Sequence, residues 1–319
     1  MGILDILYLI FIVVAVLGFI AISGMFLIWW ERKVAGHIQT RFGPMRVGWH
    51  GWLQSIADTI KLLIKEDIRP AKIDHIVFRM APYIVIVPAV MAFVVIPFSE
   101  KWIVRDLNMG LFYIVAVSGL GVFGILMAGW ASDNKYSLLG GMRAVAQMVS
   151  YEVPMIVSLI TVLLYVGSSG MNDIVKAQEN LWFIFRPNLF ICFLIYFIAG
   201  IAETNRVPFD IPEAESELVS GFHTEYSGMR FALFFVGEYT NVFIVSSVAV
   251  VVFLGGWQGP ILPGFMWFLI KVYGIIFVMM LIRWTFPRLR VDQLMSFSWK
   301  FLTPLAFINL AITAFLLLL

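Results

Sequence analysis

The segment IPEAESELVSGFHTEY, residues 211–226, gathers four glutamates in a chain that is 61% hydrophobic and only 13% charged. If the segment is helical, Glu213 and Glu217 lie one turn apart on one face, with Cβ atoms about 6 Å apart. Two carboxylates at that separation repel by about 3 kcal/mol at an effective dielectric constant of 20. This repulsion raises their pKa values toward neutral pH, so the pattern suggests a proton relay.

A purely structural interpretation covers part of this cluster. Asp210 can cap a helix with Glu213 three residues later, and acids in a first turn suit the helix dipole. That interpretation accounts for Asp210, Glu213 and partly Glu215. It leaves three acids unexplained, and for this reason the relay is favoured: Glu217, Glu225 and Glu238.

Three acids stand within or at the end of long apolar segments, where ionisable groups are costly. Glu152 and Glu238 lie about eight and seven residues into their segments, roughly 12 and 10 Å at 1.5 Å per residue. Glu203 closes a third segment on the same side of the membrane. The three are therefore expected in one layer, although each alone could reach the headgroups or cap a helix.

The elements that position these acids are apolar stretches long enough to cross a bilayer, which needs about 20 residues per helix. We expect an all-α polytopic membrane protein in which residues 1–319 form a single integral membrane domain. The first stretch has no cleavage site after it and is predicted to be retained. Eight spans are predicted: 6–30, 81–98, 111–131, 144–168, 188–203, 231–254, 265–283 and 300–319.

The distribution of Lys and Arg predicts the orientation of the spans. Seventeen of the 22 basic residues fall in or beside the loops after the first, third, fifth and seventh spans. The loops 31–80 and 202–230 are therefore expected in the cytoplasm, or in the matrix or stroma of an organelle, with both termini opposite. Within the seventh span, Lys271 is expected either to pair with an acid of a neighbouring subunit or to reach outward. Arg283 is interpreted as a positive-inside anchor.

Cofactor sites are not expected on this chain. Cys192 is the single cysteine, and the four histidines are predicted in loops, so neither a cluster site nor a haem held by two helices is expected. GLGVFG, residues 119–124, matches a dinucleotide pattern but lies inside an apolar span with no strand before it. We interpret these glycines, extended by Gly124 and Ala128, as a small face that lets helices pack closely.

The first loop contains an amphipathic helix. From Trp52 onward, apolar residues keep helical spacing over about sixteen residues, while Asp58, Lys61 and Lys65 line another face. Such a helix suits the membrane interface, either as an anchor or as the wall of a cavity for an amphipathic, lipid-soluble ligand.

These motifs together resemble one family, the quinone-chamber membrane subunit of respiratory complex I, the bacterial form of which is NADH-quinone oxidoreductase. The resemblance covers almost the whole chain, and the 202–241 block is the most specific part. Departures occur at WHGWLQS and at the Phe of RFGP in the first loop. The matching segments are ERKVAGHIQTRFGP, ADTIKLLIKED, NKYSLLGGMRAVAQMVSYEVP, AETNRVPFDIPEAESELVSGFHTEYSGMRFALFFVGEYTN and TFPRLRVDQLM.

The resemblance implies eight core helices, a quinone tunnel bordered by the first-loop helix, and a proton-pumping enzyme of which this subunit is not active alone. Quinone is then the substrate, and FMN and iron–sulfur clusters belong to partner subunits. An acidic path is implied at Glu152, Glu203, Asp210, Glu213, Glu215, Glu217, Glu225 and Glu238. Quinone-chamber positions are implied at Arg32, Arg41, Asp58, Lys61, Arg143, Arg206 and Phe231.

Expected partners are the iron–sulfur subunit with the terminal cluster, neighbouring small membrane subunits and membrane lipid, with no nucleic acid. The expected location is a bacterial plasma membrane or an organelle inner membrane. Two alternatives remain: the quinone-free membrane subunit of an energy-converting hydrogenase, and a stand-alone secondary transporter. The acidic loop and interfacial helix favour the quinone enzyme over the hydrogenase. Matching broken spans, typical of inverted repeats, are not seen, which disfavours the transporter.

Overall fold

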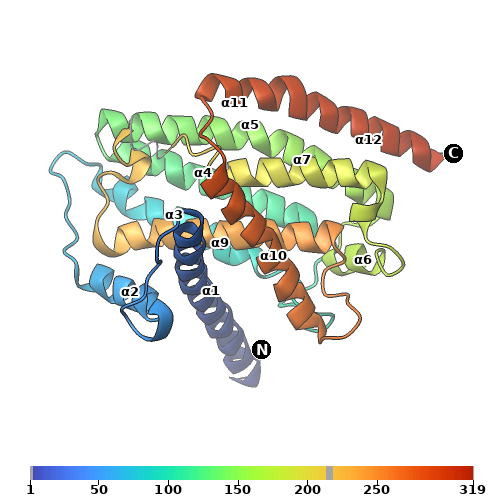
Figure 1. The fold of residues 1–319 in the computed structure, drawn as a ribbon, viewed down its shortest axis with the longest axis horizontal. Helices are drawn as coiled ribbons and strands as arrows, with labels where there is room; N and C mark the ends of the chain where they lie inside the picture. Colours follow the sequence, from blue (N-terminus) through green and yellow to red (C-terminus); the bar gives the residue numbers. More distant parts are fainter. Residues whose placement is uncertain (1–2, 213–217, 319) are drawn as a thin grey trace.

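The computed structural model describes residues 3–212 and 218–318, and within these ranges all regular structure is helical (Figure 1). The predicted acids Glu213, Glu215 and Glu217 lie outside the described residues. The longer helices are α1 (Ile3–Ile38), α2 (Gln54–Ile64), α3 (His75–Ala92), α4 (Gly110–Ala131), α5 (Lys135–Val166), α7 (Pro187–Glu203), α9 (Gly228–Phe253), α10 (Gly264–Thr285) and α12 (Thr303–Leu318). Short helices are α6 (Met171–Lys176) and α11 (Val291–Phe297), and a π-helical turn (Ser298–Leu302) joins α11 to α12.

The polytopic helical architecture is confirmed. Among the described residues, seven helices of at least 18 residues are apolar enough to cross a membrane, and α7 is a shorter apolar helix of 17 residues. Together they correspond to the eight predicted spans. Because α11, the π-helical turn and α12 are continuous, the last span begins at Val291, earlier than predicted.

Several predicted boundaries are wrong because hydropathy does not detect helix caps. α3 begins at His75, where the Asp74 carboxylate accepts hydrogen bonds from the amides of Ile76 and Val77. α5 begins at Lys135, where the Asn134 side chain accepts from the Tyr136 amide at 3.0 Å. At the other end of the first span, α1 continues to Ile38, so residues 31–38 are helix and not loop.

Two of the four histidines were also predicted incorrectly to lie in loops. His37 lies in the last turn of α1, and His75 is the first residue of α3. His50 and His223 lie outside the long helices, in short 3-10 turns.

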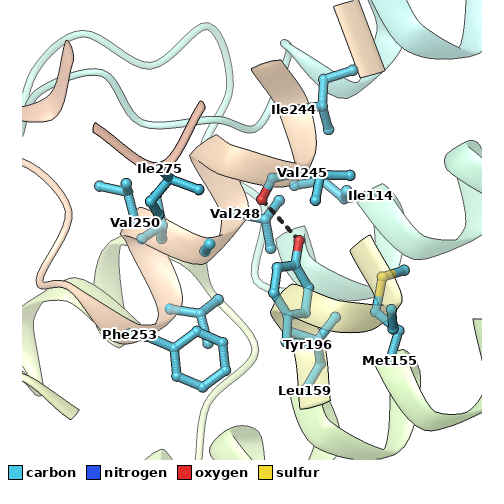
Figure 2. Close-up of a cluster of buried hydrophobic side chains, with 14 of the residues drawn as sticks. Ile114, Met155, Leu159, Tyr196, Ile244, Val245, Val248, Val250, Phe253 and Ile275 are labelled. Carbon is cyan, nitrogen blue, oxygen red and sulfur yellow. Dashed lines mark hydrogen bonds between the residues drawn. The ribbon is translucent and has the colours of Figure 1, made fainter. Parts of the chain in front are cut away.

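α9 is the central helix of the molecule. It contacts α1, α2, α3, α6, α7 and α10, and 78% of its most apolar stretch is buried, against 17% for α1. α1 and α10 cross obliquely to α5, α7 and α9 (Figure 1). Within the core, the Tyr196 hydroxyl donates to the Val245 carbonyl at 3.0 Å, among Phe253, Leu159 and Met155 (Figure 2). This buried tyrosine therefore links α7 to α9.

Part of the glycine-rich face of α4, at Gly124 and Ala128, packs closely, as predicted for the whole motif. A Cβ atom on Gly124 would lie 2.6 Å from Val85 Cγ2 and 2.9 Å from the Val85 amide nitrogen, so α3 approaches α4 more closely than any larger residue allows. Ala128 is fully buried on the same face. The dinucleotide interpretation of GLGVFG is thereby excluded, since the segment is the middle of a packed helix.

The contacts of Lys271 match neither of the two predicted alternatives, a pair with an acid of a neighbouring subunit or an outward-reaching side chain. Its ammonium donates to the carbonyl oxygens of Leu254 at 2.7 Å, Gly256 at 3.0 Å and Gln258 at 2.7 Å. It also lies 4.1 Å from the centre of the Trp182 ring. A lysine has three N–H donors, and all three are used here, so Lys271 binds the carbonyl end of α9, where the helix dipole favours a cation.

Candidate functional site: a buried glutamate between two arginines and an acidic layer

The carboxylate of Glu31 joins four parts of the chain. Arg206, in the segment after α7, donates from Nη1 to Glu31 Oε2 at 2.7 Å. The Tyr239 hydroxyl of α9 donates to the same oxygen at 2.9 Å, and Arg283 of α10 binds Oε1. The side chains of Glu31 and Arg206 are each only 5% exposed. One carboxylate thus faces two guanidinium groups, which leaves the cluster with a net positive charge.

Arg206 remains charged despite its burial. Burial acts to lower the pKa of Arg206, but the charge of Glu31, with Tyr239 and Glu238, outweighs it and holds the pKa above its ordinary value. The guanidinium carbon lies 4.6 Å from the centre of the Tyr239 ring, a cation–π geometry. Its buried Nε and Nη2 atoms find no hydrogen-bond partner among the described residues.

A cavity of about 530 Å³ opens beside this cluster, between the C-terminal end of α1, the loop after it, α9 and α10. The loop turns back because Thr40 adopts a positive φ of 52° after the end of α1. It then packs closely on the helix, since a Cβ atom on Gly36 would lie 2.8 Å from the Gly43 amide nitrogen. The lining residues are Glu31, Arg32, Ala35, Arg41, Phe42, Gly43, Pro44, Tyr239, Arg283 and Trp284.

The predicted amphipathic helix is present as α2, which begins at Gln54 and spans 11 residues, shorter than the predicted sixteen or so. An ion pair joins it to α1. Asp58 accepts from Arg32 at 2.6 Å and lies 3.5 Å from Lys61. Partial burial acts to raise the pKa of Asp58, but hydrogen bonds from Arg32 and Gln54 and the charges of Arg32 and Lys61 hold it below its ordinary value. The apolar side chains of α2 stay exposed, as on a helix at a membrane interface or a cavity wall.

Glu203 and Glu238 share a second, much smaller cavity of about 20 Å³, room for about one water molecule. Asn205 and Asn241 also line it, so a water there would have several polar partners. Oε2 of Glu203 is buried and has no hydrogen-bond partner among the described residues. Two of the three acids predicted to lie in one layer therefore line one cavity, and Glu152 does not line it.

Glu152 and Arg206 extend this acidic layer in opposite directions. Glu152 interacts electrostatically with Glu203, and its Oε1 atom would lie 3.2 Å from a Cβ placed on Gly119 of α4. On the other side, Glu238 interacts electrostatically with Arg206, which binds Glu31. Ionisable groups therefore follow one another from the Glu31 cavity to the α4–α5 contact.

The remaining predicted site residues lie outside the two cavities. Asp210 pairs with Arg288 at 2.9 Å, and Glu225 accepts from Asn134 at 2.6 Å. The Phe231 ring packs against His223, with ring centres 5.3 Å apart. Arg143 is half-buried on α5. Of the predicted chamber residues, Arg32 and Arg41 line the Glu31 cavity and Arg206 binds Glu31. Asp58 pairs with Arg32 and with Lys61 but neither lines the cavity, nor do Arg143 and Phe231.

Sequence reasoning missed Glu31 and Tyr239 and took Arg283 for an anchor. Glu31 was assigned to a loop, where an exposed acid needs no partner, because the apolar run ends near residue 30. An acid inside the continuing helix α1 would have been a signal for a buried cation.

Comparison with known proteins, like the helical fold, indicates a membrane subunit. A family model described as NADH dehydrogenase matches residues 10–314. A subunit of NADH-quinone oxidoreductase, designated H, from Dehalococcoides mccartyi (strain CBDB1) is 50% identical over 309 residues, covering 97% of this chain and 87% of the relative. The protein of the same name from Syntrophotalea carbinolica is 50% identical over 311 residues, covering 94% and 93%. With a match across almost its whole length, the chain belongs to the NADH dehydrogenase family of membrane subunits.

Proposed function

We propose that this chain is the membrane subunit of a proton-pumping NADH:quinone oxidoreductase that forms part of the quinone chamber and carries the acidic path leading from it. The relatives' names supply the enzyme class. The observation that carries the finer proposal is the row of ionisable groups from the Glu31 cavity through Arg206, Glu238 and Glu203 to Glu152.

The Glu31 cavity suits the polar head of a quinone. Its wall combines Arg32, Arg41 and Arg283 with the rings of Phe42 and Trp284, so it offers cationic donors beside apolar surface. The exposed apolar residues of α2 border the same region, where the tail of an amphipathic substrate would leave the bilayer. We assign the head group to this cavity and the tail to the α2 side.

Arg206 is the residue that connects the cavity to the acids. It binds Glu31 and interacts electrostatically with Glu238, so it is attracted from both sides. When electrons reach the quinone and Glu31 takes up a proton, Arg206 loses its nearest anion and its attraction for Glu238 increases. Glu238, Glu203 and Glu152 then redistribute their protons, with the single-water cavity bridging the first two.

The partners follow from the proposed enzyme. We assign FMN and iron–sulfur clusters to subunits of the hydrophilic arm, with the terminal cluster beside the Glu31 cavity and small membrane subunits beside the acidic layer. The location is a bacterial plasma membrane. Purification in mild detergent should recover this chain with iron–sulfur subunits and NADH:quinone activity. A chain that purifies alone and transports a solute would contradict the proposal.

The relay is tested by Glu203→Gln in the intact enzyme reconstituted in liposomes. The carboxamide keeps the shape but cannot change its charge, so we expect quinone reduction and the transmembrane pH gradient to fall together while the complex still assembles. Glu179→Gln is the matched control, because Glu179 is exposed beyond α6 and lines neither cavity. Undiminished pumping in Glu203→Gln would overturn the relay.

A second test addresses the chamber. Lys61→Ala removes a cation from the Asp58 pair on α2, and the apparent KM for quinone should rise while the amount of assembled complex is unchanged. Lys300→Ala, at a different part of the surface, is the control. An unchanged KM would argue against a chamber role for this face of α2.

A further inference from the structure

A second large crevice lies at the opposite end of the helices from the Glu31 cavity. It encloses about 530 Å³ between the first half of α1, the segment after α3 and the start of α10. Glu31 lies near the end of α1, and the Asp74 cap stands at the start of α3. The crevice lies at the other end of both helices, so it and the Glu31 cavity occupy opposite sides of the membrane. The loop beside the crevice is the one predicted to face away from the cytoplasm.

The walls of this crevice are apolar and already formed. Phe93 is 1% exposed, and the Phe19 and Phe98 rings meet edge to face with centres 5.2 Å apart. Across the opening, Trp102 packs on Phe265, also at 5.2 Å. Ala15 leaves space on α1 where a larger residue would close the crevice. Its shape and lining match those of a lipid chain, which needs depth and apolar contact but no hydrogen bonds.

A cation and an indole stand at the mouth. Lys101 lines the crevice and forms no hydrogen bond or ion pair with the described residues, and Trp102 is 64% exposed. Their loop is held in place, because the Phe98 amide donates to the Trp102 carbonyl at 3.0 Å and the Arg105 amide to the Val94 carbonyl at 3.0 Å. Lys and Trp at the end of an apolar crevice have the chemistry that contacts a lipid phosphate at headgroup depth.

We propose that this crevice binds a phospholipid of the outer leaflet, with an acyl chain against Phe93 and Phe98 and the phosphate at Lys101. The favoured head group is anionic, since Lys101 stands where the head group would lie, although Glu100 beside Lys101 tempers the preference. The site is separate from the proposed quinone chamber and does not depend on it.

Photo-crosslinking of the intact complex in nanodiscs tests the site. The probe is a phosphatidylglycerol with a diazirine in one acyl chain, and labelled peptides are identified by mass spectrometry. Labelling is expected on residues 11–19 and 93–104. Ala15→Phe should fill the crevice and abolish this labelling, whereas Val13→Phe, on the opposite face of α1 and 55% exposed, should leave it unchanged.

Lys101→Gln tests the head-group contact separately. Loss of one cation near a lipid surface, about 1 kcal/mol, should weaken competition by unlabelled phosphatidylglycerol about fivefold. Labelling that survives Ala15→Phe overturns the site, as does cross-linking of the crevice to a neighbouring subunit in place of lipid. Competition unchanged in Lys101→Gln overturns the phosphate assignment.

Discussion

At the scale of single residues, the Glu31 cluster shows how a charge is kept inside a largely apolar molecule. An ionised carboxylate is costly to bury unless its oxygens are paired, and here Arg206 and Tyr239 bind one oxygen while Arg283 binds the other. Arg206 and Arg283 both come from segments outside α1. Each therefore holds α1 in place and also balances the charge of the Glu31 carboxylate.

Tyr239→Phe is expected to destabilise this cluster without changing its charges. A hydrogen bond to a charged group contributes about 1.5–3 kcal/mol, so the purified complex should dissociate at a lower temperature on native gels. Tyr83→Phe provides the control, because the Tyr83 side chain is 53% exposed on α3. Equal dissociation temperatures for the two variants would show that the Tyr239 hydroxyl contributes nothing.

Asp58 predicts a dependence on pH. Its folded-state pKa lies below the ordinary value of about 3.9, so pairing with Arg32 stabilises α2 above that pH and is lost as the pH falls through the folded value. The measurement is the ratio of the hydrogen-exchange rates of the α2 amides in Asp58→Asn to the rates in the native protein. This ratio should exceed one at pH 7 and fall toward one in acid. Asp292→Asn is the control, because the Asp292 side chain is 78% exposed and lies outside α2. In this variant the same ratio for the α2 amides should stay near one at every pH. A ratio for Asp58→Asn that did not vary with pH would contradict the pairing.

At the scale of helices, close packing and end capping fix how the elements meet. Gly124 lets α4 approach α3, and Lys271 of α10 binds the carbonyl end of α9. Only the first of these could be predicted from sequence, because small residues at helical spacing form a visible pattern. A lysine that binds backbone carbonyls has no sequence pattern, since any loop supplies carbonyl groups.

Gly124→Ala should overpack the α3–α4 contact by about 1–3 kcal/mol and reduce the yield and thermal midpoint of the complex. Gly121→Ala is a close control three residues away, because nothing lies within 4 Å of a Cβ atom there. Val85→Ala, which removes the nearest clashing atom, should partly restore the Gly124 variant. Similar midpoints for Gly121→Ala and Gly124→Ala would disprove the close approach.

Lys271→Met should leave three backbone carbonyls without their donor. Each lost bond to a charged group contributes on the order of 1.5 kcal/mol or more, so the thermal midpoint should fall clearly. Lys176→Met, exposed on α6 at the same side, should leave the midpoint unchanged. If the two variants behave alike, Lys271 does not secure the end of α9.

At the scale of the whole molecule, the sequence predicts elements that repeat a local pattern, such as apolar helices. It does not predict contacts between residues far apart in the chain. Eight apolar runs predict seven long apolar helices and the shorter α7 that the described residues contain, and the approach of Glu203 to Glu238 followed from their place near the same side of their spans. The cluster at Glu31 could not be derived in this way. Its bonds join residues 175, 208 and 252 positions apart, and no local spacing reports such contacts.

Those separations also set an order of events during synthesis. A ribosome adding about 5–20 residues per second needs on the order of tens of seconds to pass from Glu31 to Arg283. Throughout that interval α1 has been translated while α10 has not, and the carboxylate lacks its last counter-ion. Until α10 has been inserted beside α1, Arg206 is therefore the one guanidinium group of this cluster that the chain can offer to Glu31.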